Sequence, residues 1–136
     1  KIIRVIKGTN FEYFSREAKI KFFNEDFLVT RLVDRMGMRL KGPNLKNIVN
    51  TNIKSEGLIK GTIQIPADGN PIILLSDHGT IGGYPKIAVV ISADLDKVGQ
   101  LTPGTKIKFK EVSLADAEKL FKNYLEKTNE YLNEYN

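Results

Sequence analysis

The fold is decided by four segments in the second half of the chain: LIKGTIQI (residues 58–65), IILLSD (72–77), KIAVVISA (86–93) and TKIKFKEV (105–112). Each is short and rich in β-branched or other apolar residues, and turns containing Gly, Pro or Asn separate them. Many short strands joined by such turns, with few helical segments between them, are typical of a mostly β barrel or sandwich.

The first half of the chain adds three predicted strands and a short helix. Apolar, β-rich runs predict strands at Ile2–Ile6, Phe27–Val33 and Gly37–Leu40. Ser15 can cap the first turn of a helix over Arg16–Phe23, where apolar residues recur at helical spacing. These elements extend the same mostly β pattern toward the N-terminus.

The chain closes with one clearly predicted helix. Ser113 followed by Asp116 resembles a capping box, which places the helix start at this point. One helical face is apolar, and we expect it to lie on the barrel or on a partner. We therefore divide the chain into a barrel domain, residues 1–118, and a C-terminal helical extension, residues 119–136. The apolar face consists of Leu114, Ala117, Leu120, Phe121, Tyr124 and Leu125.

Composition excludes several classes of protein. The chain has 136 residues, no cysteine and one histidine, His78, so neither a disulfide nor the ligand set of a structural zinc site can be assembled. Its longest apolar runs are far shorter than the roughly 18 residues that cross a bilayer, and the N-terminus lacks the pattern of a signal peptide. We expect a cytoplasmic location and no contact with a membrane.

A net charge of +5 raises the question of nucleic-acid binding. The basic residues are scattered rather than clustered: Lys106, Lys108 and Lys110 alternate, as on the solvated face of a strand. No cluster of basic and aromatic residues resembles an RNA-binding signature. We therefore expect no nucleic-acid partner.

The loop Asp77–Lys86 contains the densest group of chemically useful residues. Its glycines, including Gly82 and Gly83, allow backbone amides to approach an anion or oxyanion. Asp77 can transfer a proton, Tyr84 can donate a hydrogen bond or stack, and Lys86 can stabilise negative charge. The alternative is a mobile connection with a solvated Lys86. A serine triad from Ser76, Asp77 and His78 is disfavoured because neighbouring side chains on a strand point to opposite faces.

Two further groups of residues are candidates for substrate binding. Arg35 and Arg39 can bind a carboxylate or phosphate bidentately, or can instead pair with Asp34 and Glu56. Gln64 ends a predicted strand, and its amide is both donor and acceptor, which suits a ureido or lactam group. The alternative for Gln64 is an ordinary residue of the outer sheet face.

Four ordered motifs in this sequence resemble the biotin-dependent carboxyltransferase family, also called allophanate hydrolase subunit 2. This family includes the C subunit of bacterial 5-oxoprolinase and the antagonist of the sporulation kinase inhibitor. The resemblance runs from about Arg4 to Glu118 and corresponds to the C-terminal half of the family protein. The motifs are Arg35–Pro43, Ser55–Gly57, Gly61–Pro66 and Asp77–Ile87, with Gly82–Lys86 at the centre of the last.

The resemblance implies a cyclophilin-like closed β-barrel and three alternative functions. The favoured one is a role in an ATP-dependent 5-oxoprolinase complex that opens 5-oxoproline to glutamate, with two partner subunits, one kinase-inhibitor-like (B) and one lactam-hydrolase-like (A). The second is carboxyl transfer from carboxybiotin to an acceptor such as urea. The third is non-catalytic binding that relieves a kinase-inhibitor homologue. The isolated half is expected to be inactive.

The expected cofactors and site residues follow from the resemblance and from the residues themselves. ATP is expected in the complex, but no phosphate-binding loop on this chain can hold it. Biotin would arrive on a separate carrier, since no lysine stands between methionines. The expected catalytic residues are Asp77, Tyr84 and Lys86. The expected substrate-binding residues are Arg35, Arg39, Glu56, Gln64, Thr80, Gly82 and Gly83.

Overall fold

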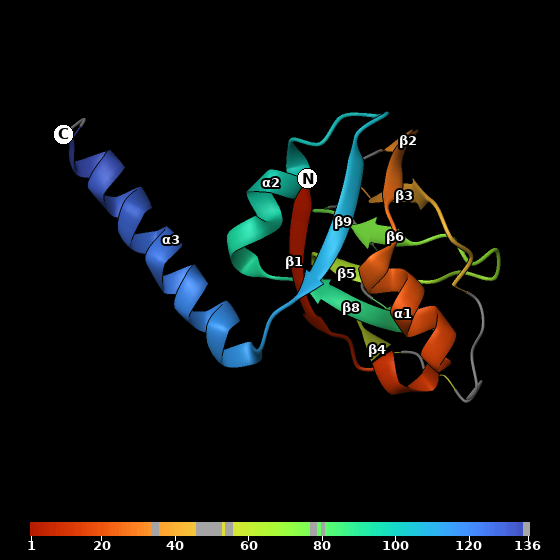
Figure 1. The fold of residues 1–136 in the computed structure, drawn as a ribbon. Coiled ribbons are helices and arrows are strands. Elements are labelled where there is room, and N and C mark those ends of the chain that lie inside the picture. The colour runs from red at the N-terminus through yellow and green to blue at the C-terminus, as the bar shows by residue number, and fades with distance from the viewer. Residues whose placement is uncertain (34–35, 46–52, 54–55, 77–78, 80, 135–136) are drawn as a thin grey trace.

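The computed structural model describes residues 1–33, 36–45, 53, 56–76, 79 and 81–134, and it has the expected mostly β architecture. Figure 1 shows a barrel of strands with a short helix on one side and a long helix projecting on the other. No helix in the described residues is long and apolar enough to span a membrane. The elements are β1 (Ile2–Lys7), η1 (Phe11–Tyr13), α1 (Arg16–Asn24), β2 (Phe27–Val33), β3 (Gly37–Lys41), β4 (Glu56–Gly57), β5 (Thr62–Gln64), β6 (Ile72–Leu74), β7 (Ile81–Gly82), β8 (Lys86–Val90), η2 (Ser92–Asp94), α2 (Leu95–Gly99), β9 (Lys106–Glu111) and α3 (Leu114–Glu134).

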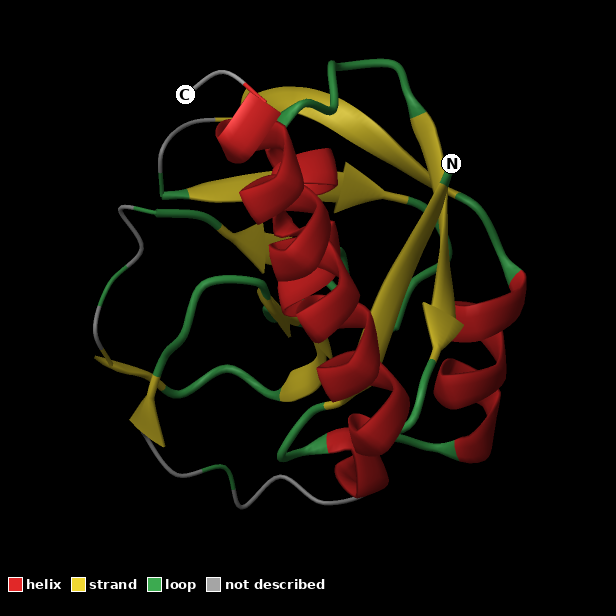
Figure 2. Ribbon diagram, turned by 90° about the vertical axis from the view of Figure 1, so that its left-hand side faces the viewer, coloured by secondary structure: helices red, strands yellow, loops and turns green. Residues whose placement is uncertain are grey.

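Seven of the strands close into a barrel in the order β1, β8, β5, β6, β3, β2 and β9. Figure 2 shows strands around the barrel and the long C-terminal helix in front of them. The neighbouring pairs are antiparallel except at the point of closure, where β1 and β9 run parallel with Ile3 opposite Phe109. Figure 1 shows these two strands side by side. The closed barrel expected from the series of short strands is confirmed.

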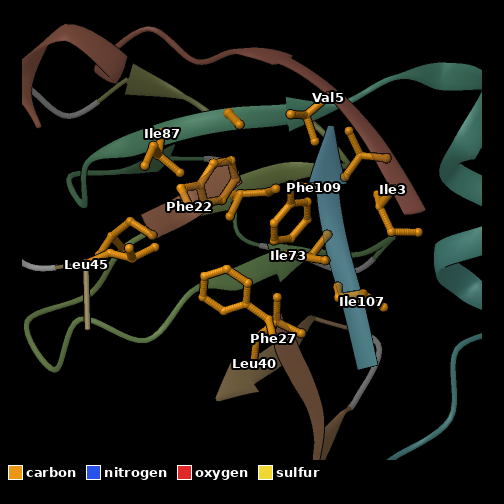
Figure 3. Close-up of a cluster of buried hydrophobic side chains, with 14 of the residues drawn as sticks. Ile3, Val5, Phe22, Phe27, Leu40, Leu45, Ile73, Ile87, Ile107 and Phe109 are labelled. Carbon is orange, nitrogen blue, oxygen red and sulfur yellow. The ribbon is translucent and has the colours of Figure 1, made fainter. Parts of the chain in front are cut away.

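The barrel interior is filled by aliphatic and aromatic side chains (Figure 3). Phe22 of α1 stacks on Phe109 with ring centroids 4.6 Å apart, and Phe27 lies 5.6 Å from Phe109. Burial of each such ring contributes about 1.5–3 kcal/mol to folding. Ser15 caps α1 as predicted, because its Oγ accepts a hydrogen bond from the backbone N–H of Ala18 at 3.1 Å.

All four strands predicted in the second half of the chain are shorter in the structure, and for the segments 58–65 and 86–93 the backbone shows why. The segment 58–65 contributes only β5, because Gly61 has a φ of +90° and breaks the extended backbone. The N–H of Thr62 donates to the carbonyl of Ile59 at 3.2 Å, which closes a turn before the strand. The segment 86–93 stays extended only through Val90 and then enters η2.

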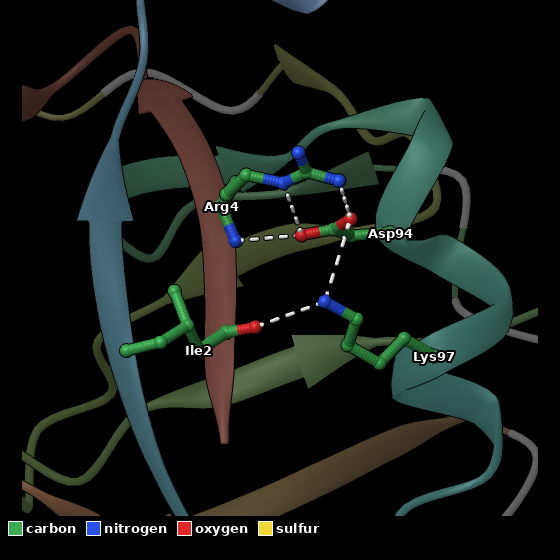
Figure 4. Close-up of polar contacts among 4 residues, drawn as sticks. All are labelled: Ile2, Arg4, Asp94 and Lys97. Atoms are coloured by element: carbon green, nitrogen blue, oxygen red, sulfur yellow. Dashed lines mark hydrogen bonds and ion pairs between the residues drawn. The ribbon is translucent and has the colours of Figure 1, made fainter. Parts of the chain in front are cut away.

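An ion pair between a partly exposed arginine and a buried aspartate attaches η2 and α2 to β1 (Figure 4). The carboxylate of Asp94 is 1% exposed. It accepts two hydrogen bonds from the Arg4 guanidinium, at 2.6 and 3.1 Å, and a third from the backbone N–H of Arg4 at 2.8 Å. Lys97 lies 3.8 Å from the same carboxylate and donates to the carbonyl of Ile2 at 3.2 Å. These contacts fix the short helices against the barrel wall.

The C-terminal helix α3 begins at Leu114, as the sequence predicts. The Oγ of Ser113 accepts a hydrogen bond from the N–H of Asp116 at 3.1 Å. Ala117 is buried, and the hydroxyl of Tyr124 donates to the carboxylate of Asp96, so the helix contacts the barrel near α2. Its remaining length projects away from the barrel in Figure 1. The division at residue 118 stays a prediction.

Candidate functional site

A cavity of about 650 Å³ lies on the outer face of the barrel, over β3, β6 and β5. The strand registers explain its floor: Arg39 lies opposite Ile72, and Ile72 lies opposite Gln64, so the three side chains share one face. The residues between them, such as Ile73, point into the core. The described lining residues are Arg31, Leu32, Val33, Met36, Gly37, Arg39, Leu58, Gln64, Ile72, Leu74, Gly79, Gly82, Gly83 and Tyr84.

A two-stranded ribbon of β4 and β7 lies against this floor. Its register places Glu56 opposite Gly82 and Gly57 opposite Ile81. Gly82 approaches the floor closely, since a Cβ atom at this position would lie 2.8 Å from Nε2 of Gln64 and 3.0 Å from Leu58. A larger residue at this position would force the Gln64 amide or the Leu58 side chain to shift.

Gln64 combines burial with an unsatisfied hydrogen-bond donor. Its side chain is 5% exposed, it lines the cavity, and its Nε2 has no hydrogen-bond partner among the described residues. A buried donor without a partner costs about 1–3 kcal/mol. An unpaired donor at the floor of a cavity is typical of a group that forms its hydrogen bond with a bound ligand. Gln64 therefore lies on the outer sheet face, as the alternative interpretation has it, but it is buried there beneath the cavity, and its role in binding stays a prediction.

Lys86 is buried rather than solvated, so the alternative of a solvated Lys86 is wrong. It lies opposite Gln64 in the sheet register and is 4% exposed. Its Nζ donates to the carbonyl oxygens of Gly82 and Tyr84, both at 3.2 Å, and its backbone N–H donates to Oδ1 of Asn10 at 2.9 Å. Lys86 therefore anchors the glycine-containing segment. It is not among the described residues that line the cavity.

The other predicted site residues divide into three groups. Gly82, Gly83, Tyr84 and Arg39 line the cavity together with Gln64, and Tyr84 is 51% exposed at its edge. Glu56 contributes its backbone to the ribbon. The remaining predictions, Asp77, Arg35 and Thr80, together with the Glu56 side chain and His78, lie outside the part of the chain that the structure describes.

Sequence reasoning missed Arg31, which lines the cavity beside Leu32 and Val33. In a regular strand Arg31 would share the inward face of Phe27 and Val29. A charged residue at an inward position is a signal of strand irregularity, and it was available in the sequence. No group of three metal-ligating side chains occurs among the described residues.

Comparisons with known proteins support the resemblance stated above. The chain is 38% identical over 119 residues to the C subunit of 5-oxoprolinase from Haemophilus influenzae and 37% identical over 117 residues to that of Escherichia coli. These matches cover 88% and 86% of this chain, but the chain spans only 38% of the length of either relative.

The solved structures that match include two from Kluyveromyces lactis. They are urea amidolyase and urea carboxylase, each with a TM-score of 0.85 and 31% identity over 92% of this chain, and with 8% and 12% of their own chains covered. The family model described as carboxyltransferase domain, subdomain A and B, matches residues 1–111. The chain therefore belongs to the carboxyltransferase-domain family of subdomains A and B.

Proposed function

We propose that this chain is the substrate-binding barrel in the C subunit of a 5-oxoprolinase, which acts with its A and B partner subunits to open 5-oxoproline to glutamate. The observation that carries the proposal is the buried, unpaired Nε2 of Gln64 at the floor of the cavity. A lactam carbonyl is an acceptor suited to this donor, and the lactam N–H can bond to the amide oxygen of the same side chain. The names of the two bacterial relatives support the same reaction.

The reaction requires addition of water to the lactam carbonyl carbon, stabilisation of the oxyanion that forms on the former carbonyl oxygen, and then cleavage of the C–N bond with protonation of the leaving nitrogen. Gly82 and Gly83 line the cavity, so their backbone amides are candidates for this stabilisation. Lys86 holds the carbonyls on either side of Gly83 and so orients the segment. We assign proton transfer to Asp77 and substrate contact to Tyr84, with Arg35, Thr80 and Glu56 as further binding residues.

The geometry also supports a need for the remainder of the protein and for partners. Leu32, Met36 and Tyr84 line the cavity and are 67%, 58% and 51% exposed. Apolar side chains so exposed around a cavity are typical of a surface that another part of an assembly covers. We infer that the isolated chain is inactive. ATP would bind elsewhere in the complex, because the chain has no phosphate-binding loop.

Carboxyl transfer to urea is the second candidate, and it is favoured by the TM-score of 0.85 to the Kluyveromyces lactis urea carboxylase. The Gln64 amide suits the ureido ring of biotin as well as a lactam, since both present a carbonyl beside an N–H. Biotin would then be supplied by a separate carrier. The third alternative, binding to a kinase-inhibitor homologue without catalysis, predicts complex formation with no turnover of either substrate.

The test is turnover by the full-length protein assembled with both partner subunits and ATP. We expect 5-oxoproline to be hydrolysed, urea plus a biotin carrier to give no product, and Gln64→Leu to reduce kcat/KM by about 10²-fold. The matched control is Gln100→Leu, because Gln100 is the chain's other glutamine, is exposed and does not line the cavity. Equal activity of wild type and Gln64→Leu would reject the proposal.

A further inference from the structure

Strands β2 and β3 are paired irregularly where they border the cavity. Val29 lies opposite Leu40 and Val33 lies opposite Met38, so three residues of β2 correspond to the single residue Arg39 of β3. A β-bulge of this kind redirects side chains that a regular strand would alternate between faces. It explains why the consecutive residues Arg31, Leu32 and Val33 all line the cavity.

The hydroxyl of Thr30 stabilises the bulge. Its Oγ1 accepts a hydrogen bond from the backbone N–H of Leu32 at 3.2 Å and donates one to the carbonyl oxygen of Arg39 at 2.9 Å. These bonds satisfy backbone groups that lose their regular ladder partners at the irregularity. They also hold the backbone of Arg39 beside the residue that precedes Arg31. Arg31 and Arg39, on adjacent strands, line the same cavity.

Both guanidinium groups lack a carboxylate partner in the described part of the chain. The recorded ion pairs there involve Arg4 and several lysines, but neither Arg31 nor Arg39. These arginines are also the only charged residues among the described lining residues. Two positive charges that line one largely apolar cavity favour an anion, and a guanidinium binds a carboxylate bidentately.

We propose that Arg31 determines the specificity of this cavity by binding the carboxylate of the substrate, with Arg39 as the second donor. The ligand class is a small cyclic amide that carries a carboxylate. Its anionic end lies against β2 and β3, and its amide end lies at Gln64. Only the assignment of the amide end rests on the proposed function. The carboxylate site is inferred independently, from the bulge and the two arginines.

The experiment measures binding to the full-length protein in complex with its partner subunits, without ATP, by isothermal titration calorimetry. Three probes separate the two ends of the ligand: L-5-oxoproline carries both groups, cyclopentanecarboxylate carries only the acid, and 2-pyrrolidinone carries only the lactam. The variants are Arg31→Gln, which removes the charge, and Arg31→Lys, which keeps the charge without the planar fork. Arg16→Gln is the matched control, because Arg16 is exposed on α1 and is not among the described residues that line the cavity.

We expect Arg31→Gln to weaken binding of L-5-oxoproline and cyclopentanecarboxylate by about 10- to 100-fold, consistent with the loss of hydrogen bonds to a charged group. Binding of 2-pyrrolidinone should change by less than about twofold in the same variant, on the argument that a neutral lactam makes no ion pair. Arg31→Lys should restore part of the affinity, and Arg16→Gln should match wild type.

Two results would overturn the proposal. One is unchanged cyclopentanecarboxylate affinity in Arg31→Gln, and the other is an equal loss for all three probes, which would indicate a structural defect. A different set of results would reject the proposed function but keep the carboxylate site. If 2-pyrrolidinone never binds and 5-oxoproline is not turned over, but cyclopentanecarboxylate binding depends on Arg31, the carboxylate site stands and lactam hydrolysis is rejected.

Discussion

Gly82 lies against the side-chain amide of Gln64, and a methyl group at position 82 would approach Nε2 to 2.8 Å. We expect Gly82→Ala to displace the Gln64 amide, to lower turnover by at least tenfold and to cost about 1 kcal/mol of stability through overpacking. Gly57→Ala is the control, since Gly57 lies on the other strand of the ribbon and a Cβ there meets nothing within 4 Å. Similar kinetics for the two variants would contradict the contact. Steady-state assay of the assembled complex measures the difference.

The unpaired Nε2 of Gln64 gives a prediction about the sign of a stability change. Because Gln64→Leu removes a buried donor that has no partner, we expect the free energy of unfolding to rise by about 1 kcal/mol while activity is lost. Urea denaturation of the variant beside wild type and Gln100→Leu measures this change. A loss of stability in Gln64→Leu would show that its donor is satisfied in the folded protein.

The Thr30 hydroxyl joins the backbones of Leu32 and Arg39, and its removal should loosen the bulge. We expect Thr30→Val, which keeps the side-chain shape, to cost about 1 kcal/mol of stability and to raise KM for 5-oxoproline more than it lowers kcat. Thr30→Ser keeps the hydroxyl and should restore the KM. A variant with an unchanged KM would separate the bulge from substrate binding.

The Arg4–Asp94 pair should make stability depend on pH. Burial of the carboxylate opposes its ionisation, but the hydrogen bonds and charge of Arg4 outweigh this effect and lower the pKa of Asp94 below its ordinary value. The stability gained is therefore present above the unfolded-state pKa of about 3.9 and is lost as the pH falls through the lower, folded-state pKa.

We expect Asp94→Asn to destabilise the protein by about 2–4 kcal/mol at pH 7 and to flatten the acid limb of the stability curve. Urea denaturation across pH 2–7 measures both effects, with about six pH values resolving the limb. Asp26→Asn is the control, because Asp26 forms an exposed 3.8 Å pair with Lys108 that should contribute less than about 1 kcal/mol. Parallel acid limbs for wild type and Asp94→Asn would contradict the assignment.

Much of the barrel could be predicted from local patterns. The alternation of Lys106, Lys108 and Lys110 with Ile107 and Phe109 places the apolar residues of β9 inside the barrel, and the structure confirms it. The break at Gly61 in the strand predicted over residues 58–65 could also have been predicted, since an isolated glycine in a strand pattern often marks a break. What local pattern cannot supply is the order of the strands, which depends on contacts distant in sequence.

The candidate site was only partly predictable for the same reason. Gln64, Arg39 and the glycine pair could be chosen for their chemistry, and they line one cavity. The ribbon of β4 and β7 has two residues in each strand, too few to show a periodicity. The charge of Arg31 at an inward position of β2 could have indicated an irregular strand, but its place at the cavity depends on the register shift of β2 against β3, which only the pairing of the two strands shows.

The parallel pairing of β1 with β9, which closes the barrel, limits how fast this domain can fold. Ile3 finds its partner, Phe109, 106 positions later in the sequence. Pairing at such a separation incurs a large loop-closure entropy, so we expect a slow, high-contact-order refolding reaction on the millisecond-to-second scale. Until β9 arrives, β1 has an unpaired edge that can recruit a strand from another molecule. During synthesis the nascent barrel therefore stays open, and prone to association, until Glu111 has left the ribosome.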